Sequence, residues 1–126
     1  MPINLFDASM EGLSKALAVH QQRHQVLVGN IANVETPGFH AKELDFSRTL
    51  QSAFDEPSRA GTTDAIAAEP AKIIEDVEGP LRLDGNSVDV DLQMAKLAAN
   101  SGRYNTLAKL LGKRFGLLRQ AIDGTR

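Results

Sequence analysis

Residues 6–34 read FDASMEGLSKALAVHQQRHQVLVGNIANV, and the spacing of their side chains decides how this part of the chain folds. Mostly apolar residues recur in alternating steps of four and three, the heptad spacing that turns one side of a helix toward a partner helix. No proline falls between residues 9 and 33, and about 25 residues of helix would form a rod of about 37 Å. We therefore predict an N-terminal helix. Its seam consists of Phe6, Met10, Leu13, Leu17, His20, His24, Leu27, Ile31 and Val34.

A second heptad pattern begins near Asp91 and continues toward the C-terminus. Asp89 and Asp91 stand where an acidic cap or first-turn residue favours the start of a helix, and Arg119 and Arg126 lie toward the other end, where cations suit the helix dipole. Capping chemistry and periodicity thus agree on a C-terminal helix. Its seam consists of Met94, Leu97, Ser101, Tyr104, Ala108, Leu111, Phe115, Leu118 and Ile122.

Four more leucines widen the apolar face of this helix. Leu92, Leu107, Leu110 and Leu117 lie beside the C-terminal seam, and a single partner helix is too narrow to cover both the seam and these leucines. We therefore expect partner subunits to complete the core. The residues assigned to subunit packing are Leu13, Leu17, Leu27, Ile31, Met94, Leu97, Tyr104, Leu111, Phe115, Leu118 and Ile122.

Residues 36–88, between the two helices, hold every proline except Pro2 and four glycines, so no helix is expected to run through them. Residues 55–69 are small and polar, the composition of a flexible loop. Residues 72–77, 81–83 and 87–90 carry apolar residues at short spacing near turn-forming Gly-Pro and Asp-Gly pairs, which predicts a small β-hairpin.

The predicted fold class is mainly α. Long terminal helices pair as an antiparallel-type coiled coil, and an irregular, partly disordered middle holds the small hairpin. We divide the chain into an N-terminal helix segment (1–35), a loop and extended segment (36–88) and a C-terminal helix segment (89–126). At 126 residues, these segments together form one domain.

Charge is distributed unevenly along the chain. Residues 43–91 contain twelve acids and four bases, whereas residues 92–126 contain one acid and seven bases. Such asymmetry is compatible with nucleic-acid binding, but subunits that stack also place opposite charges on complementary faces. Leucines dilute the basic segment, which disfavours the nucleic-acid interpretation.

Other classes of protein are constrained by what the chain lacks. The absence of cysteine excludes disulfides, thiol catalysis and thiolate metal sites. The N-terminus has no pattern of a secretory signal peptide, and no apolar run is long enough to span a bilayer. Taken alone, these features favour a cytoplasmic protein.

The residues that follow the N-terminal helix predict a turn. Pro37 sets φ near −65° and Gly38 supplies the positive φ that a type II turn needs at its next position. Asn30 and Asn33 are three residues apart, so both lie on one face of the last helical turn and can bond backbone groups freed there. By themselves these residues are also compatible with an ordinary helix end.

Two longer stretches resemble a known family. NIANVETPGFHAKELDF (residues 30–46) is similar to the N-terminal signature of the flagellar rod, hook and axial proteins, and DGNSVDVDLQMAKLAANSGRYNTLAKLLGKRF (residues 84–115) resembles the C-terminal half of the proximal rod class of that family. The short middle also favours a rod subunit over hook-type members, which carry large inserted domains. The residues that carry the resemblance are Asn30, Asn33, Thr36, Pro37, Gly38, Phe39, Asp84, Gly85 and Asn86.

The resemblance implies a structural role and a location. Members of this family are exported through the flagellar type III apparatus without a cleaved signal peptide and assemble as the periplasmic rod of the basal body. The implied partners are copies of the chain itself, other rod subunits, the adaptor that joins the rod to the membrane ring, and the export apparatus. It implies no nucleic acid, no small-molecule substrate and no cofactor.

His20 and His24 interrupt the N-terminal seam at two consecutive core-type positions. A metal-binding pair, a pH-sensitive register device and a satisfied polar layer between subunits are all compatible with this spacing. The metal interpretation lacks a third ligand, because His40 lies beyond the Pro37-Gly38 turn. We favour the polar layer and assign no metal site.

Catalysis finds little support in the sequence. An enzyme needs a nucleophile with a base or paired carboxylates in a pocket, and the acids of residues 43–91 are scattered through predicted loop. We therefore predict a protein without catalytic residues. A soluble two-helix adaptor or chaperone is the alternative, and it does not explain the turn motifs at residues 30–39.

Overall fold

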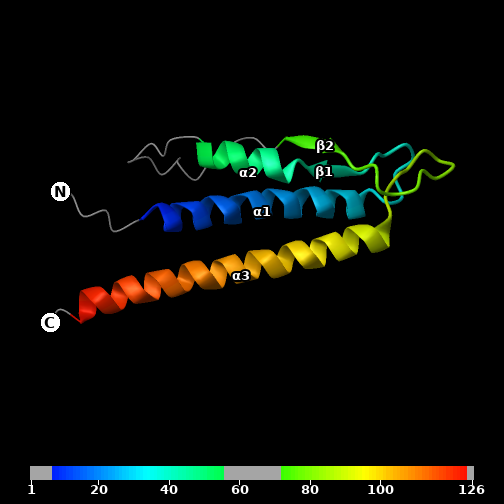
Figure 1. The fold of residues 1–126 in the computed structure, drawn as a ribbon. Helices are drawn as coiled ribbons and strands as arrows, with labels where there is room; N and C mark the ends of the chain where they lie inside the picture. The colour runs from blue at the N-terminus through cyan, green and yellow to red at the C-terminus, as the bar shows by residue number, and fades with distance from the viewer. Residues whose placement is uncertain (1–6, 56–71, 125–126) are drawn as a thin grey trace.

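The computed structural model describes residues 7–55 and 72–124. It contains α1 (Ala8–Ala32), β1 (Lys42–Leu44), α2 (Phe46–Asp55), β2 (Ile73–Glu75) and α3 (Val90–Asp123). The two long helices run antiparallel along the length of the molecule, with β1, β2 and α2 on the opposite side of α1 from α3 (Figure 1). The predicted pair of packed terminal helices is thus confirmed.

Both long helices begin at an aspartate cap. The carboxylate of Asp7 accepts a hydrogen bond from the backbone N–H of Met10, and that of Asp89 accepts one from Leu92. Each bond satisfies one of the N–H groups that the first turn of a helix leaves without an intrahelical partner. The cap that the sequence predicts at Asp89 is therefore present.

Contacts between α1 and α3 follow the antiparallel order. Asp7 pairs with Arg114 near the free ends, His20 with Asn100 in the middle, and Asn30 with Gln93 at the closed end. Val19 and Leu27 are completely buried on α1.

A small apolar core joins α1 to the middle segment. Val19, Leu44 and Ala53 are buried together, and Phe46 and Leu50 pack against them. The core therefore draws on α1, β1 and α2, and α1 forms the central layer of the molecule.

The middle segment contains a helix that the sequence analysis missed. Proline and glycine are absent from residues 46–55, although both are frequent elsewhere in the middle. Thr49 and Ala53, four residues apart, are buried on the face of α2 that meets α1. No helix runs through residues 36–88, as expected, but a short one forms within them, because ten residues free of breakers suffice when α1 covers their apolar face. Of the predicted flexible loop, residues 56–69 lie outside the described residues.

The hairpin prediction was wrong about which segments pair as strands. β1 and β2 form an antiparallel two-stranded sheet in which Lys42, Glu43 and Leu44 oppose Glu75, Ile74 and Ile73. Residues 81–83 and 87–90 form no strand, because backbone bonds close a turn there between Arg82 and both Gly85 and Asn86. The strand at residues 73–75 therefore pairs with a segment about thirty residues away.

Candidate functional site

The signature residues of the two halves of the chain meet at one end of the helix pair. The side-chain amide of Asn86, which is completely buried, donates to the carbonyls of Asn33, Val34 and Thr36 at distances of 2.8–3.1 Å. Its oxygen accepts from the backbone N–H of Val88 at 2.7 Å. One side chain thus satisfies carbonyls that the end of α1 leaves free, and it ties the residues after α1 to those before α3.

Two glycines allow the two signature turns to approach each other closely. Gly38 and Gly85 have φ values of +72° and +82°, and a Cβ on Gly85 would lie 3.3 Å from the Cα of Gly38. The backbone N–H of Gly38 donates to the carbonyl of Asp84, and that of Ser87 donates to the carbonyl of Phe39. The positive φ expected at Gly38 is therefore present, and the two motifs lie against each other as one unit.

The asparagines of the first motif have separate functions. Asn30 is buried, and its side-chain amide bonds both the N–H and the carbonyl of Lys42 at 2.9 and 2.6 Å, as a neighbouring strand would. Asn33 donates to the carbonyl of Gly29 and accepts from the hydroxyl of Thr36. Asn30 thus holds β1 against α1, whereas Asn33 closes the helix end, as the sequence predicts. The remaining motif residues, Pro37 and Phe39, are exposed and half-buried respectively.

A buried polar pair lies midway along the helices. Nδ1 of His20 is 2.7 Å from Oδ1 of Asn100, and the amide of Asn100 donates to the backbone carbonyl of His20. Because the amide nitrogen is already engaged, Oδ1 accepts and Nδ1 of the imidazole donates. The ring of His20 also packs on Phe46, with the centroids 4.9 Å apart. The polar layer at His20 was expected between subunits, whereas in the structure the partner of His20 belongs to the same chain.

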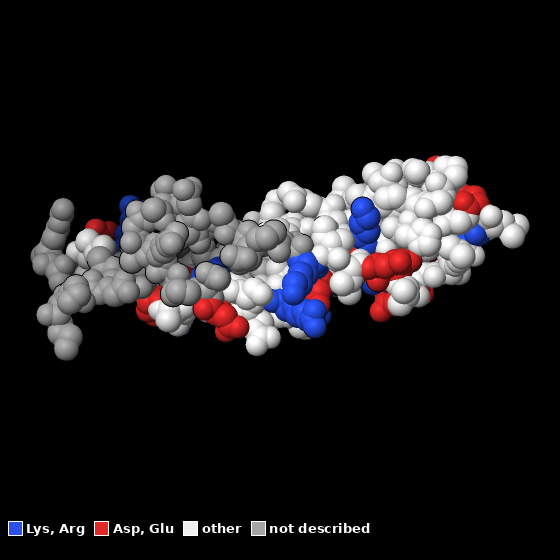
Figure 2. All heavy atoms as spheres, turned by 90° about the horizontal axis from the view of Figure 1, so that it is seen from above, with Lys and Arg blue, Asp and Glu red and all other residues white. Residues whose placement is uncertain are grey.

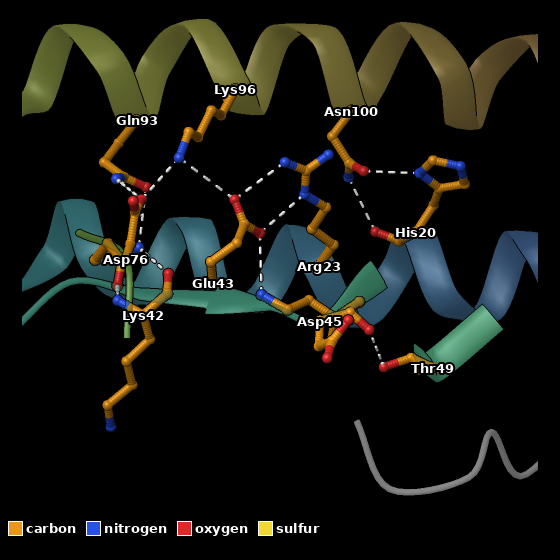
Figure 3. Close-up of polar contacts among 12 residues, drawn as sticks. His20, Arg23, Lys42, Glu43, Asp45, Thr49, Asp76, Gln93, Lys96 and Asn100 are labelled. Carbon is orange, nitrogen blue, oxygen red and sulfur yellow. Dashed lines mark hydrogen bonds and ion pairs between the residues drawn. The ribbon is translucent and has the colours of Figure 1, made fainter. Parts of the chain in front are cut away.

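An ion cluster links the helices to the sheet (Figure 3). Arg23 of α1 binds Glu43 of β1 through two hydrogen bonds of 3.0 Å. Lys96 of α3 lies 3.5 Å from the same carboxylate and 2.8 Å from both Asp76 and Glu78. Three carboxylates from two separate segments of the chain therefore converge on one lysine.

Gln93 connects this cluster to the signature residues. Its amide donates to Asp76 at 3.0 Å, while its oxygen accepts from Asn30 at 2.9 Å. Both Gln93 and Asp76 are buried. Because a buried polar group without a partner is costly, the network requires all its members to be in place together.

The ionisation of the cluster follows from these contacts. Burial opposes charge on Glu43, but hydrogen bonds from Arg23 and from the backbone of Leu44, with the nearby cations, hold its pKa below the ordinary value. Burial acts likewise on Asp76, and hydrogen bonds from Lys96 and Gln93 lower its pKa. Burial would lower the pKa of Lys96, yet its carboxylate partners raise it. All three groups are thus held in their charged forms.

The N-terminal residues assigned to subunit packing lie along the inner side of α1. Leu27 is buried within the chain, and Leu13, Leu17 and Ile31 are half-buried. On α3, Leu97, Tyr104, Leu111 and Leu118 are half-buried, whereas Met94, Phe115 and Ile122 are about half exposed or more. Contact of any of them with another subunit stays a prediction.

The face of α3 that meets α1 differs in part from the predicted seam. Gln93 and Asn100 occupy it as buried residues, although the seam passes through Met94 and Ser101, one position further along. These two polar residues were missed because only apolar periodicity was counted. Their spacing of seven residues is itself a heptad, and it was the available signal. Nothing in the local sequence marked Arg23, Glu43, Asp76 or Lys96.

His24 is a second correction. It is exposed, and Arg23 takes the inward position on that turn because Glu43 offers it a carboxylate. The expectation that both histidines occupy the core seam was therefore wrong. Across residues 7–55 and 72–124, no group of three or more histidine or acidic side chains is arranged to hold a metal ion.

The charged surface was compared with the nucleic-acid interpretation. On the face that carries α2 and the sheet, basic and acidic side chains of the described residues are interspersed (Figure 2). The described residues on this face therefore form no broad basic patch of the kind that tracks a phosphate backbone. None of the helices in the described part of the chain is both long and apolar enough to cross a membrane.

Comparison with known proteins gives the family. No family model matches the chain. The flagellar basal body rod protein FlgB of Cereibacter sphaeroides is 33% identical over 118 residues, which cover 88% of this chain and 91% of that protein. FlgB of Aeromonas hydrophila is 32% identical over 126 residues (94% and 96%), and FlgB of Escherichia coli K12 is 30% identical over 136 residues (97% and 99%).

These similarities span nearly the whole chain, including both signature turns, and they agree with the resemblance carried by residues 30–46 and 84–115. The chain therefore belongs to the FlgB family of flagellar basal body rod proteins and is a structural, non-enzymatic component of that rod.

Proposed function

We propose that the chain polymerises through its terminal helices, with copies of itself and with other rod subunits, to form the proximal part of the drive shaft. In this position it transmits torque from the membrane ring to the hook. The observation that carries the proposal is the apolar surface that α3 leaves exposed after α1 has packed against it.

Two rows of exposed apolar residues lie in the C-terminal half of α3, in addition to the exposed Val90 and Met94 near its start. Leu110 and Leu117 are seven residues apart and 47% and 59% exposed, and Phe115 and Ile122 are seven residues apart and 47% and 62% exposed. Residues at this spacing lie on one side of a helix, so each row marks one side of α3. Large apolar side chains that gather in this way on an exposed helix are typical of an interface. We therefore assign both rows to contacts with neighbouring subunits.

The contacts within the chain are those expected of a subunit that transmits torque. Side chains join α1 to α3 near both ends and in the middle, and the ion cluster fixes the sheet to both helices. Polar contacts of this kind specify one register of a helix pair, because any slip leaves buried polar groups without partners. A subunit with one fixed register can pass torque without internal sliding.

Several further features belong to this proposal. Segments 1–35 and 89–126 form the axial core with segment 36–88 between them, and the chain is exported without a cleaved signal peptide to the periplasmic rod. There it meets the adaptor that joins the rod to the membrane ring. These features are supported by the family membership and by the resemblance of residues 84–115 to proximal rod proteins.

Leu117→Asp tests the proposal. A carboxylate placed in an exposed row should leave the fold intact but prevent desolvation of the interface, so we expect export and ring formation with loss of rod assembly and of swimming. Asn105→Asp, at an exposed position on the same helix, is the matched control and should swim normally. Normal swimming by the Leu117→Asp strain would count against the interface.

A further inference from the structure

Residues 77–84, which we term the tip, project beyond the paired ends of α1 and α3 (Figure 1). Val77, Leu81 and Leu83 are 83%, 66% and 110% exposed, the highest values among the large hydrophobic residues described. Three strongly exposed aliphatic side chains on one short loop exceed what chance exposure of single residues explains.

Arg82 anchors the tip to the end of α1. The guanidinium of Arg82 donates to the carbonyl of Val34, and its backbone N–H donates to the carbonyl of Asn86 at 2.8 Å. With the bond from the backbone N–H of Gly85 to the carbonyl of Arg82, these contacts close a turn in which Leu83 is fully exposed. The outward position of Leu83 is therefore held by specific bonds.

Acidic residues surround these leucines. Residues 73–91 contain six acids and a single base, Arg82. Of these acids, Glu75, Glu78, Asp84 and Asp91 are exposed. Glu78 lies 2.8 Å from Lys96 and Asp84 lies 3.8 Å from Arg82, so the acids outnumber their cationic partners at this end of the molecule. A leucine-bearing surface with an acidic rim is complementary to an apolar surface with a basic rim.

We propose that the tip docks on a basic amphipathic helix of a different rod subunit. This inference rests on the proposed function, since it names one of the contacts by which the chain joins the rod. Leu81 and Leu83 enter the apolar face of that helix, and Glu78 and Asp84 face its lysines and arginines. Arg82 is a positioning residue that anchors the turn that carries Leu83.

The chemistry of the partner helix is illustrated by α3 itself. Residues 104–124 contain four bases and one acid together with the two exposed apolar rows. A contact from the tip of one copy to α3 of the next would be head-to-tail, and unless its rotation closes into a ring such a contact between identical subunits continues as an open filament. A chain confined to the proximal part of the rod therefore uses the tip to meet a different subunit.

Cross-linking at the tip tests this assignment. The chain has no cysteine, so Leu83→Cys introduces a single thiol, and a maleimide–succinimidyl ester reagent joins it to a nearby lysine. In purified basal bodies, we expect residue 83 to be linked to a lysine of a basic amphipathic segment in another rod protein. Ser52→Cys, exposed on α2, is the matched control and should not give this link. A link from residue 83 to α3 of a second copy, to a component outside the rod, or to nothing would overturn the assignment.

The Leu83→Cys chain and the unmodified chain together distinguish the failure of the tip proposal from the failure of the proposed function. If the Leu83→Cys chain is present in the rod but is linked elsewhere, the docking of the tip fails and the rod function stands. If the unmodified chain is absent from purified rods, the proposed function fails.

A pair of substitutions gives an independent readout. Leu83→Glu should abolish swimming while the purified chain keeps its thermal unfolding profile, because residue 83 makes no buried contact, and Leu83→Met should swim normally. Swimming by the Leu83→Glu strain would contradict the docking.

Discussion

Asn86 satisfies more backbone groups than any other side chain in the signature turns, since it reaches three carbonyls and one N–H from a position without solvent exposure. Asn86→Ala should lower the free energy of unfolding by about 3 kcal/mol, because it leaves several buried groups without partners. Urea unfolding followed by circular dichroism would measure this. Asn105→Ala, exposed on α3, should change stability by less than about 0.5 kcal/mol. Equal effects of the two substitutions would argue against the role of Asn86.

Gly85 and Gly102 provide opposite expectations for the same substitution. Gly85→Ala should destabilise by about 1–2 kcal/mol, because φ is +82° and the added Cβ would crowd Gly38. Gly102→Ala should stabilise by up to about 1 kcal/mol, because it lies inside α3 with open space around it. Thermal unfolding of the two variants would test both signs, and a stabilised Gly85→Ala chain would refute the close approach of the two turns.

Individual residues differ in how far sequence alone could place them. Pro37 and Gly38 could be assigned to a turn because their φ preferences are local. Gln93 and Asn100 could not be assigned to the interior, because a polar side chain is buried only when it has a hydrogen-bond partner there. Their partners, Asn30 and His20, are 63 and 80 residues away in the sequence.

At the scale of elements, the ion cluster makes the docking of β1 and β2 on the helices dependent on pH. The pKa values of Glu43 and Asp76 are lower in the folded chain, so the unfolded state binds more protons in acid. Stability is therefore fully present above the ordinary carboxyl pKa values and is lost as pH falls through the folded values. The pKa of Lys96 is raised above 10.5, so its contribution is lost only as pH rises through that folded value.

Glu43→Gln tests this dependence. Below about pH 5, the free energy of unfolding should fall less steeply for the variant than for the unaltered chain, because one proton-linked group is gone. Urea unfolding between neutral and acid pH would give the two slopes. Glu35→Gln, exposed beyond α1, serves as the control. Identical acid slopes for Glu43→Gln and the unaltered chain would exclude a contribution from Glu43.

Local signals predicted some elements and failed for others. The long helices carry many heptad positions and their own caps, so each is specified within its own segment. α2 is only ten residues long and depends on α1 to cover Thr49 and Ala53. β2 has three residues and pairs with β1 rather than with a neighbouring turn. Short elements of this kind are decided by what they pack against.

At the scale of the whole molecule, the leucines form two groups, those buried inside the chain and those exposed on its surface. Leu27→Ala should destabilise by about 3 kcal/mol through a buried cavity. Leu117→Ala, at a residue 59% exposed, should change stability by less than about 0.5 kcal/mol. If the proposed interface is correct, the second variant should nevertheless weaken rod assembly, measured as the amount of chain recovered in purified basal bodies. A large loss of stability in Leu117→Ala would place this residue in the core instead.

Sequence by itself determined that two long helices lie at the ends of the chain, that the second starts near Asp89, and that a Pro-Gly turn follows the first. It also determined the family, through residues in and around the two turns. These features depend on periodicity, capping and φ preferences, which act over a few residues.

Only the tertiary structure decided which face of α3 meets α1, that Gln93 and Asn100 rather than Met94 and Ser101 lie on it, and that β2 pairs with β1. It also brought the two signature turns together through Asn86. Each of these depends on a partner far away in the sequence, because a buried polar group or a short strand is stable only when its complement is present.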